Sequence, residues 1–287
     1  MTRAEKVSKF NRAVLAWYRK HGRDLPWRRT TDPYEILVSE IMLQQTQVDR
    51  VCTKYEQFIS AVPTTRALTR ASTREVLTLW SGLGYNRRAL YLQRTAENIE
   101  SLHNGTFPLL REELLRLPGI GMSTASAVRS FAFGEDDPMI DTNVRRILRR
   151  VFFSKKEISD TELYKFALEI IPKEKGREWN YAVMDIAALH CKAHSHSAEC
   201  PLAQLHGKNP VIISKKPQKK FVGSDRYYRG AILRLVTEKG ETTIIRVAKA
   251  FDAEPKKIKV IAKKMCYEGL VMLKNGRMTF PNKRRNV

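Results

Sequence analysis

The chain is organised around the stretch Leu114-Leu115-Arg116-Leu117-Pro118-Gly119-Ile120-Gly121-Met122-Ser123-Thr124-Ala125-Ser126-Ala127. Leu114, Leu115 and Leu117 are spaced as on an amphipathic helix, and Pro118-Gly119 stops such a helix. Gly121 permits a second turn before Ser123 or Thr124 begins an alanine-rich helix. The pattern therefore predicts two helices joined by a tight turn.

The turn Gly119-Ile120-Gly121 leaves backbone N–H groups without partners at the start of a helix. Unpaired donors and the helix dipole both favour an anion there, and in a basic chain a nucleic-acid phosphate is the natural candidate. This is the arrangement of a helix-hairpin-helix motif. Taken alone, the run is also compatible with an ordinary helix connection that needs two glycines.

Length, composition and charge indicate a globular protein with a polyanionic partner. The 287 residues suggest about two domains, and 43% of them are hydrophobic. No run approaches the roughly 18 apolar residues of a membrane span, and the first residues resemble a charged helix rather than a signal peptide. The net charge of +22 favours nucleic acid as the partner. We expect a monomeric, cytoplasmic protein of a bacterial or archaeal cell, associated with the nucleoid and not with a membrane.

Two carboxylates stand out on predicted helices. Glu40 lies among Ile36, Leu37, Ile41 and Leu43 on a helix that starts at Asp32-Pro33. A carboxyl in apolar surroundings has a raised pKa and can donate a proton near neutral pH, although the periodicity alone is equally consistent with a solvent-facing side chain.

The second carboxylate, Asp141, precedes Thr142-Asn143-Val144 and a helix with a basic face. It is predicted to be the N-cap of that helix, and capping alone would account for it.

Helices are predicted from residue 3 to residue 190 with no strand between them, and Leu25-Pro26-Trp27-Arg28-Arg29 is expected to be an extended bridge. The turn Gly82-Leu83-Gly84-Tyr85 places an aromatic side chain before Arg87-Arg88, a composition suited to insertion beside a phosphate backbone. A tyrosine packed within a loop is the alternative.

The end of the chain is predicted to be a small separate domain. From Lys208 onward, 21 lysines and arginines stand against 6 acidic residues, so +15 of the net charge lies there. Three helices and a hairpin around Asn275-Gly276 suggest a winged-helix-like domain. Its third helix carries Lys256, Lys257 and Lys263, which either contact DNA or form a solvated lysine-rich face.

Several motifs together resemble one family, the helix-hairpin-helix DNA glycosylases, and within it the adenine DNA glycosylases of the MutY type. The resemblance covers about residues 5–206. Five motifs in the family's order carry it: Leu25-Pro26-Trp27-Arg28, Ser39-Glu40-Ile41-Met42-Leu43-Gln44-Gln45-Thr46-Gln47-Val48, Trp80-Ser81-Gly82-Leu83-Gly84-Tyr85, Leu117-Pro118-Gly119-Ile120-Gly121-Met122-Ser123-Thr124-Ala125 and Asp141-Thr142-Asn143-Val144.

The resemblance implies a mainly α fold, in which a six-helix domain and an N/C-terminal helical domain precede the winged-helix-like domain. The expected boundaries are residues 1–28 and 136–207 for the helical domain, 29–135 for the six-helix domain, 208–223 for a basic linker and 224–287 for the terminal domain.

The resemblance also implies roles for individual residues on double-stranded DNA containing a mismatch or 8-oxoguanine. Glu40 would protonate the leaving adenine, and Asp141, assisted by Asn143, would stabilise the sugar cation. The residues expected to contact DNA are Gln44, Gln45, Tyr85, Arg88, Leu117, Gly119 and Gly121.

Ser123 occupies the position at which related bifunctional enzymes carry a lysine. Without an amine there is no Schiff base, so a monofunctional glycosylase specific for adenine is expected. Removal of thymine or uracil opposite guanine is one alternative, and a catalytically idle DNA-binding protein is another.

Departures from the family concern its metal and its terminal domain. Relatives usually hold a [4Fe-4S] cluster on C-x6-C-x2-C-x5-C, whereas this chain keeps Cys191 and Cys200 and has His206 at the fourth position. We expect a degenerate site without a cofactor, with zinc on Cys191, His194 or His196, Cys200 and His206 as the alternative. The winged-helix-like end stands where many members carry a Nudix-like domain that reads 8-oxoguanine.

Overall fold

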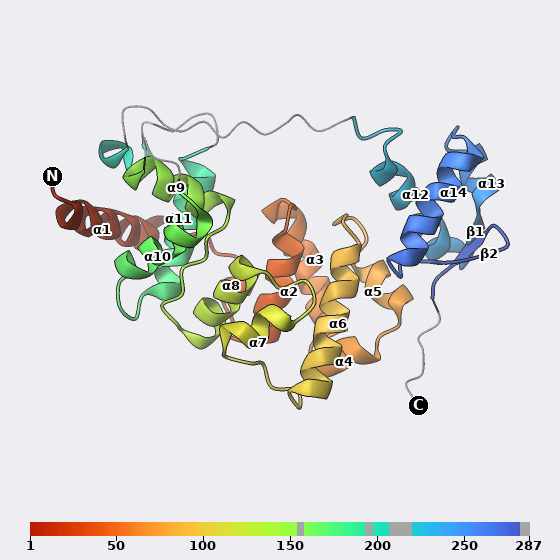
Figure 1. Cartoon of the computed structure of the whole chain (residues 1–287), viewed down its shortest axis with the longest axis horizontal. Coiled ribbons are helices and arrows are strands. Elements are labelled where there is room, and N and C mark those ends of the chain that lie inside the picture. The colour runs from red at the N-terminus through yellow and green to blue at the C-terminus, as the bar shows by residue number, and fades with distance from the viewer. Residues whose placement is uncertain (154–157, 193–196, 198, 207–219, 282–287) are drawn as a thin grey trace. The chain divides into compact units, whose positions relative to one another are not determined.

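The computed structural model describes residues 1–153, 158–192, 197, 199–206 and 220–281 (Figure 1). The chain divides into two compact units, one of residues 1–40 and 107–215 and the other of residues 41–106 and 216–287. The division falls inside helix α2 (Pro33–Leu43), between Glu40 and Ile41. The four-part division expected from the sequence stays a prediction.

The first unit is helical in its described residues. Besides α2 its elements are α1 (Arg3–His21), the 3-10 turn η1 (Pro26–Arg28), α7 (Arg111–Arg116), α8 (Met122–Phe133), α9 (Thr142–Phe152), α10 (Asp160–Ile170), α11 (Gly176–Leu189) and the 3-10 turn η2 (Ala203–Leu205). The sequence pattern predicts helices at residues 160–170 and 178–190, which agree with α10 and α11 to within two residues, whereas α9 extends four residues beyond the predicted stretch 142–148. Gly22 ends α1 as expected, and its N–H donates to Tyr18 O.

The core of this unit lies where α1, α9 and α11 meet. Phe10 of α1, Ile147 of α9 and Trp179 of α11 are fully buried. The Phe10 and Trp179 rings pack edge to face with centroids 6.2 Å apart. Burial of such large apolar side chains contributes the main stabilising free energy, about 1.5–3 kcal/mol for each. It also fixes α9, whose N-terminus carries Asp141.

The residues predicted to form an extended bridge instead contain a 3-10 turn, η1, so that expectation was wrong. Its cause is an ion pair between elements that are far apart in sequence. The guanidinium of Arg28 donates two hydrogen bonds, of 2.7 and 2.8 Å, to the carboxylate of Asp185 on α11. Asp185 is completely buried and also accepts bonds from the backbone N–H and the Nε of Arg23. Removing one partner of a buried pair of this kind costs about 3–5 kcal/mol, because the other charge is left uncompensated.

The second unit contains four helices from the middle of the chain. They are α3 (Val48–Ala61), α4 (Thr65–Arg70), α5 (Thr73–Leu79) and α6 (Arg87–Leu102). Phe58 of α3 and Trp80, which caps α5, are fully buried and pack edge to face. The sequence pattern predicts helices at residues 48–59, 65–71, 73–79 and 87–101, and each agrees with the observed helix to within two residues.

The terminal part of this unit has three helices and a small sheet. In order, its elements are α12 (Asp225–Lys239), β1 (Glu241–Thr243), α13 (Ile244–Ala250), α14 (Pro255–Tyr267), β2 (Met272–Lys274) and β3 (Arg277–Thr279). The sheet is antiparallel with strand order β1-β3-β2, and Met278 of β3 lies opposite both Thr242 and Leu273. The hairpin around Asn275-Gly276 is confirmed, and both residues have positive φ as such a turn requires. Strand β1 was not predicted, and the winged-helix-like assignment stays a prediction.

None of the helices in the described part of the chain is long and apolar enough to cross a membrane.

Candidate active site

Glu40 lies near the end of α2 and belongs to the first unit. The residue is buried, with 6% of its surface exposed. Burial and the nearby Asp141 raise the pKa of Glu40 to about 8, and Arg28 lowers it by a smaller effect. Among the described residues, burial and nearby charges determine the pKa of this carboxyl, and no hydrogen bond contributes to it. Glu40 is therefore largely protonated at neutral pH. Of the two orientations that the sequence left open, the structure has the buried one.

Asp141 is the N-cap of α9, as predicted. Its Oδ1 accepts hydrogen bonds from the backbone N–H groups of Asn143 and Val144, at 2.8 and 2.7 Å. Its Oδ2 accepts one from the Nδ2 of Asn143, at 3.0 Å. Burial raises the pKa of Asp141, while these three hydrogen bonds and Arg146 act in the opposite direction. The carboxylate is thus held in a fixed orientation at the positive end of a helix.

Asn143 is itself held in place by the helix that it starts. Its Oδ1 accepts a hydrogen bond of 2.9 Å from Arg146, whose guanidinium also donates to the backbone oxygens of Ala187 and Cys191. The side-chain amide of Asn143 is therefore fixed with its Nδ2 toward Asp141. The structure thus joins two of the four residues that were predicted to be catalytic.

Ser123 is the second residue of α8 and is half-buried. In the described part of the chain, no hydrogen bond joins it to Glu40 or Asp141. Its predicted place in the active site stays a prediction.

The predicted turn between two helices is confirmed by α7, α8 and the residues between them. Gly119 has a φ of +82°, which favours glycine, and Leu117 is buried and accepts the Ile120 N–H that closes the turn. Gly121 is the N-cap of α8, and no side chain caps this helix. The start of α8 thus lacks a side-chain cap, which is a feature of helix N-termini that bind a phosphate.

Residues expected to contact DNA in the second unit have different surroundings from one another. Gln44 is half-buried and Gln45 is exposed with a φ of +57°. Tyr85 is 44% exposed, and its φ of +47° marks a strained position in the turn before α6.

Arg88, which is expected from the sequence to contact DNA, has a side chain that is bound inside the second unit. It is buried, and its guanidinium donates to the backbone oxygens of Ile41, Met42, Gln44, Leu83 and Gly84. Burial lowers its pKa to about 10. Its charge is thus used to tie the end of α2 to the turn that carries Tyr85.

The predicted lysines on α14 are exposed. Lys257 is partly engaged, since its Nζ donates to Gly223 O at 2.9 Å and lies 4.9 Å from the centre of the Tyr228 ring. Lys256 and Lys263 point their charge to solvent.

The residues around Cys191 do not fit the four-cysteine cluster of the family. Cys191 and Cys200 are buried, whereas Ser197 or Ala198 stands near the second position and His206 at the fourth, and a [4Fe-4S] cluster of this type is held by four thiolates. The Cys191 sulfur accepts a hydrogen bond of 2.9 Å from Arg150, and burial raises the pKa of the Cys200 thiol. Among the described residues no group of three His, Cys, Asp or Glu could hold a metal ion. His194 and His196, part of the alternative zinc site, lie outside the described residues.

Comparison with known proteins decides the family. Residues 38–173 match the model of the HhH-GPD superfamily base excision DNA repair proteins. A curated adenine DNA glycosylase of Mycobacterium tuberculosis is 38% identical over 77% of this chain and 76% of its own length. The chain belongs to the HhH-GPD superfamily. This confirms the resemblance and the fold class that its motifs predicted.

Other HhH-GPD relatives differ in their names and in the share of their length that is matched. An adenine DNA glycosylase of Buchnera aphidicola is 37% identical over 76% of this chain but only 65% of its own length. A thymine/uracil-DNA glycosylase of Pyrobaculum aerophilum is 36% identical over 68% of this chain and 89% of its own length. A solved thermostable thymine-DNA glycosylase has a TM-score of 0.67 and 29% identity, covering 71% of this chain and 96% of that one. A trapped complex of endonuclease III with DNA has a TM-score of 0.64 and 25% identity, covering 72% and 96%.

Two residues beside the carboxylates of this HhH-GPD site were not assigned a role from the sequence. Arg28 lies over the ring of Tyr181, with the guanidinium carbon 4.2 Å from the ring centre. Arg28 Nε and the Tyr181 hydroxyl are buried without a hydrogen-bond partner in the described structure. Burial raises the pKa of Tyr181, and the charge of Glu40 raises it further by a smaller effect. Tyr181 and Asp185 are four residues apart on α11, so they share a helix face. This spacing is the sequence feature from which their common contact with Arg28 could have been inferred.

The first testable prediction concerns the proton on Glu40. Its pKa is near 4.5 in the unfolded chain and about 8 when folded, so the unfolded state alone releases the proton between these values. Folding stability contributed by this site therefore falls as the pH rises from 4.5 to 8. We expect Glu40→Gln to raise the Tm relative to the wild type by an amount that grows over this range and then stays constant.

Thermal unfolding followed by circular dichroism at a series of pH values measures this difference. Glu35→Gln, on the same helix, is the matched control for the loss of one carboxyl group. A Tm difference between Glu40→Gln and wild type that is independent of pH would show that Glu40 is ionised at neutral pH and cannot serve as an acid.

Proposed function

We propose that this protein is a monofunctional adenine DNA glycosylase, which hydrolyses the N-glycosidic bond of adenine opposite 8-oxoguanine or guanine. The observation that carries the proposal is a buried carboxyl, Glu40, whose pKa is raised to about 8 by burial and by the charge of Asp141, together with the fixed position of Asp141 at a helix N-terminus. Loss of a base needs a proton for the leaving nitrogen and an anion for the developing sugar cation. The pair supplies both.

In this proposal Glu40 transfers its proton to a ring nitrogen of the extruded adenine. The bond between C1′ and the base then breaks, and its electron pair leaves with the base, which is neutral because it was protonated. A pKa of about 8 suits this role, since the carboxyl keeps its proton at neutral pH yet releases it to a base whose basicity rises during cleavage.

Asp141 stabilises the positive charge that develops on the sugar. Its hydrogen bonds with Asn143 and Val144 hold the carboxylate before the charge appears, so little reorganisation is needed during the reaction. A water molecule then attacks C1′, and the Glu40 carboxylate, now ionised, accepts the proton that the water loses. Atoms and charges balance, and Glu40 returns to its starting state.

DNA binding in this proposal uses groups in both units. The uncapped start of α8 at Gly121 binds a backbone phosphate. The exposed Tyr85 and Gln45 are suited to insertion into the duplex, which base extrusion requires. Lys256 and Lys263 of α14 supply contacts with phosphates that carry no sequence information.

The cofactor and the surroundings of the enzyme belong to the same proposal. The donors at Cys191, Ser197, Cys200 and His206 favour a site without an iron–sulfur cluster, and zinc on these cysteines and histidines is the alternative. The charge of +22 favours a monomer that stays associated with cellular DNA.

A second candidate function is removal of thymine or uracil opposite guanine. It is favoured by the thymine/uracil-DNA glycosylase relative, which is matched over 89% of its length, a larger share than in the adenine-specific relatives described above. Adenine is preferred because of Glu40 and of Ser123, the features that the sequence resemblance links to adenine enzymes. The two candidates predict excision from different duplexes.

The second prediction tests which base is removed and whether Asp141 takes part in the reaction. Duplexes containing A opposite 8-oxoguanine, A·G, G·T and G·U are incubated with excess enzyme and then treated with alkali, which breaks the strand at abasic sites. We expect breaks at adenine in the first two duplexes. Asp141→Asn should lower the single-turnover rate by at least about 100-fold, since it removes charge stabilisation of the transition state.

Binding of the same duplexes by Asp141→Asn, measured by fluorescence anisotropy, should stay within about threefold of the wild type, because the lost charge acts on the transition state. Strand breaks only in the G·T and G·U duplexes would show that the enzyme removes thymine and uracil, and would contradict the proposed activity on adenine. A wild-type rate in Asp141→Asn would remove Asp141 from the reaction.

The third prediction tests the position of Ser123. In Ser123→Lys an amine is expected to attack C1′ of the sugar, form an imine after loss of the base and permit strand cleavage by elimination. Reduction with borohydride should then give a covalent protein–DNA product, which gel electrophoresis detects. Met122→Lys, on the neighbouring exposed position, is the matched control. Excision of adenine by Ser123→Lys without any trapped product would place Ser123 outside the active site.

The fourth prediction concerns α14. The triple variant Lys256→Ala, Lys259→Ala, Lys263→Ala should bind duplex DNA more weakly and with a salt slope reduced by about 2.7, since each lost phosphate contact removes about 0.9. The loss should be the same for matched DNA, A·G and A opposite 8-oxoguanine.

The matched control removes three exposed lysines from helices and a loop of the first unit, at Lys9, Lys165 and Lys173. Equal effects of the two triple variants would mean that α14 acts only through overall charge. A loss confined to 8-oxoguanine would mean that this helix recognises the lesion.

A further inference from the structure

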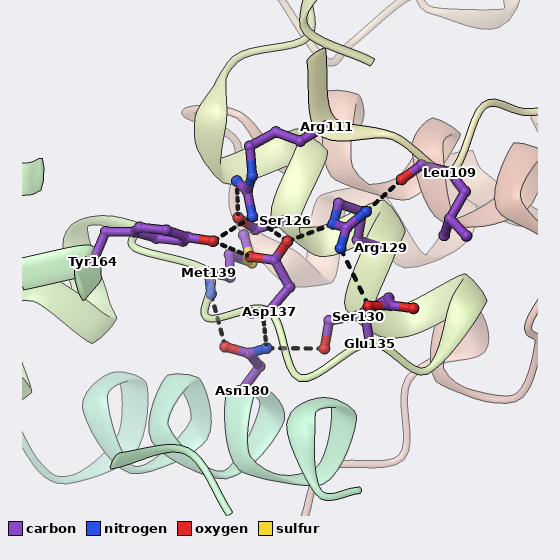
Figure 2. A network of polar contacts seen from close by, with 10 residues as sticks. All are labelled: Leu109, Arg111, Ser126, Arg129, Ser130, Glu135, Asp137, Met139, Tyr164 and Asn180. Atoms are coloured by element: carbon purple, nitrogen blue, oxygen red, sulfur yellow. Dashed lines mark hydrogen bonds and ion pairs between the residues drawn. The ribbon is translucent and has the colours of Figure 1, made fainter. Parts of the chain in front are cut away.

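The segment of residues 134–141, which joins α8 to α9, ends at Asp141 and is bound on several sides by buried polar groups (Figure 2). Asn180 of α11 is completely buried. Its Oδ1 accepts the backbone N–H of Met139 at 2.9 Å, and its Nδ2 donates to the backbone oxygen of Asp137 at 2.9 Å. One side chain therefore replaces two strand-like hydrogen bonds along this segment. Its remaining hydrogen is donated to Ser130 of α8 at 3.0 Å.

The side chain of Asp137 is the second anchor of the segment, and it is almost completely buried. Its carboxylate accepts hydrogen bonds from Arg111, from the Nε of Arg129 at 2.7 Å and from the Tyr164 hydroxyl at 3.2 Å. These donors come from α7, α8 and α10 (Figure 2). Burial and Asp137 raise the pKa of Tyr164 to about 12, so its hydroxyl remains a donor at neutral pH.

Asp136 provides a third anchor on the other side of the segment. Its carboxylate accepts the backbone N–H groups of Glu174, Lys175 and Gly176, at 2.8, 3.1 and 2.8 Å. The approach is so close that a Cβ at Gly176 would lie 2.4 Å from the backbone oxygen of Glu135. The start of α11 and the segment are thus in direct backbone contact.

The anchors lie close in sequence to the reacting group. Met139, held by Asn180, accepts the N–H of Asp141 at 3.1 Å, and Asp141 then caps α9. Only three residues therefore separate Asp137 from Asp141 in the chain. A shift of the segment moves the Asp141 carboxylate or breaks its bonds with Asn143 and Val144.

We propose that Asn180 and the ion cluster of Asp137, Arg111, Arg129 and Tyr164 form a clamp that positions Asp141 for the reaction. Asn180 and Asp137 are positioning residues, because they act through the backbone of residues 137–141. The proposal rests on the function proposed above. A displacement of about 1 Å in a reacting group costs on the order of 100-fold in rate, so a clamp of this kind has a measurable effect.

A ligand site is the other use that such a cluster could have, and the contacts argue against it. A cavity of about 480 Å³ is lined by Arg111, Arg129, Asp137 and Tyr164, among others. Both guanidinium groups are already paired with Asp137, and Arg129 also pairs with Glu135 at 3.2 Å. Since both arginines are paired with carboxylates of the protein, they are not left to bind an anionic ligand.

The fifth prediction compares Asn180→Ala with Asn11→Ala. Asn11 also joins helices of the first unit through its side chain, donating to Ile170 O and accepting from Trp179 Nε1, but its bonds lead away from Asp141. Both variants should lower the Tm. Only Asn180→Ala should lower the single-turnover rate of adenine excision, by about 10- to 100-fold, with the Kd for the duplex within about threefold of wild type.

Milder variants keep the test informative if Asn180→Ala does not fold. Tyr164→Phe removes one donor to Asp137 and should lower the rate by about threefold, whereas Ser130→Ala leaves both bonds to the segment intact and should leave the rate unchanged within about twofold. The rates are measured well below the Tm of each variant.

Amide hydrogen exchange gives a readout that does not depend on activity. In Asn180→Ala and Tyr164→Phe the amides of Asn143 and Val144 should exchange faster than in wild type, and in Asn11→Ala they should not. Unchanged exchange at these amides, or equal loss of rate in Asn11→Ala and Asn180→Ala, would overturn the clamp. Absence of adenine excision by the wild type, with faster exchange in the clamp variants, would overturn the proposed function and leave the clamp standing.

Discussion

Two carboxyl groups buried next to each other cannot both be ionised cheaply, and this constraint organises the site. Glu40 and Asp141 share the desolvation that raises both pKa values. Asp141 has two backbone amides, the Asn143 side chain and Arg146 to stabilise its negative charge, whereas the described residues offer Glu40 no hydrogen bond. These surroundings favour the proton on Glu40 and the negative charge on Asp141, which is the division of roles that the proposed reaction needs. Neither role follows from the residue type, since both are ordinary carboxylic acids.

The rest of the first unit keeps this unequal pair in place. Asp185 fixes Arg28, and Arg28 stands close enough to Glu40 to lower its pKa without ionising it fully at neutral pH. Asn143 and Arg146 bind the start of α9 to the end of α11 through Cys191. Arg146 and Arg150 of α9 donate to the backbone oxygen and to the sulfur of Cys191, so this cysteine is joined to α9 by hydrogen bonds of the protein itself.

Local sequence signals predicted most helices, because capping residues and apolar periodicity act over a few positions. Asp141 shows this well, since an aspartate before Thr142 and Asn143 is enough to predict an N-cap. The burial of Glu40 could not be predicted in this way, because its helix is apolar on several faces. The 3-10 turn at Pro26–Arg28 and the clamp at Asn180 depend on partners about 40 to 160 residues away, which no local pattern reveals. Strand β1 has three residues and exists through its pairing with β3.

A count of charged residues in the sequence does not show which charges are paired inside the protein and which are exposed to solvent. Arg28, Arg88, Arg146 and Arg150 are buried, and their guanidinium groups donate to carboxylates, backbone oxygens or a sulfur. Arg111 and Arg129 likewise form ion pairs with Asp137. The planar guanidinium suits such internal bonding, whereas the strongly hydrated lysine amine favours the surface. The lysines of α14 are exposed, and among the residues that the structure describes they form one ion pair, between Lys264 and Asp225 at 3.8 Å. The six arginines named here therefore bind groups of the protein itself, whereas the lysines of α14 keep their charge at the surface.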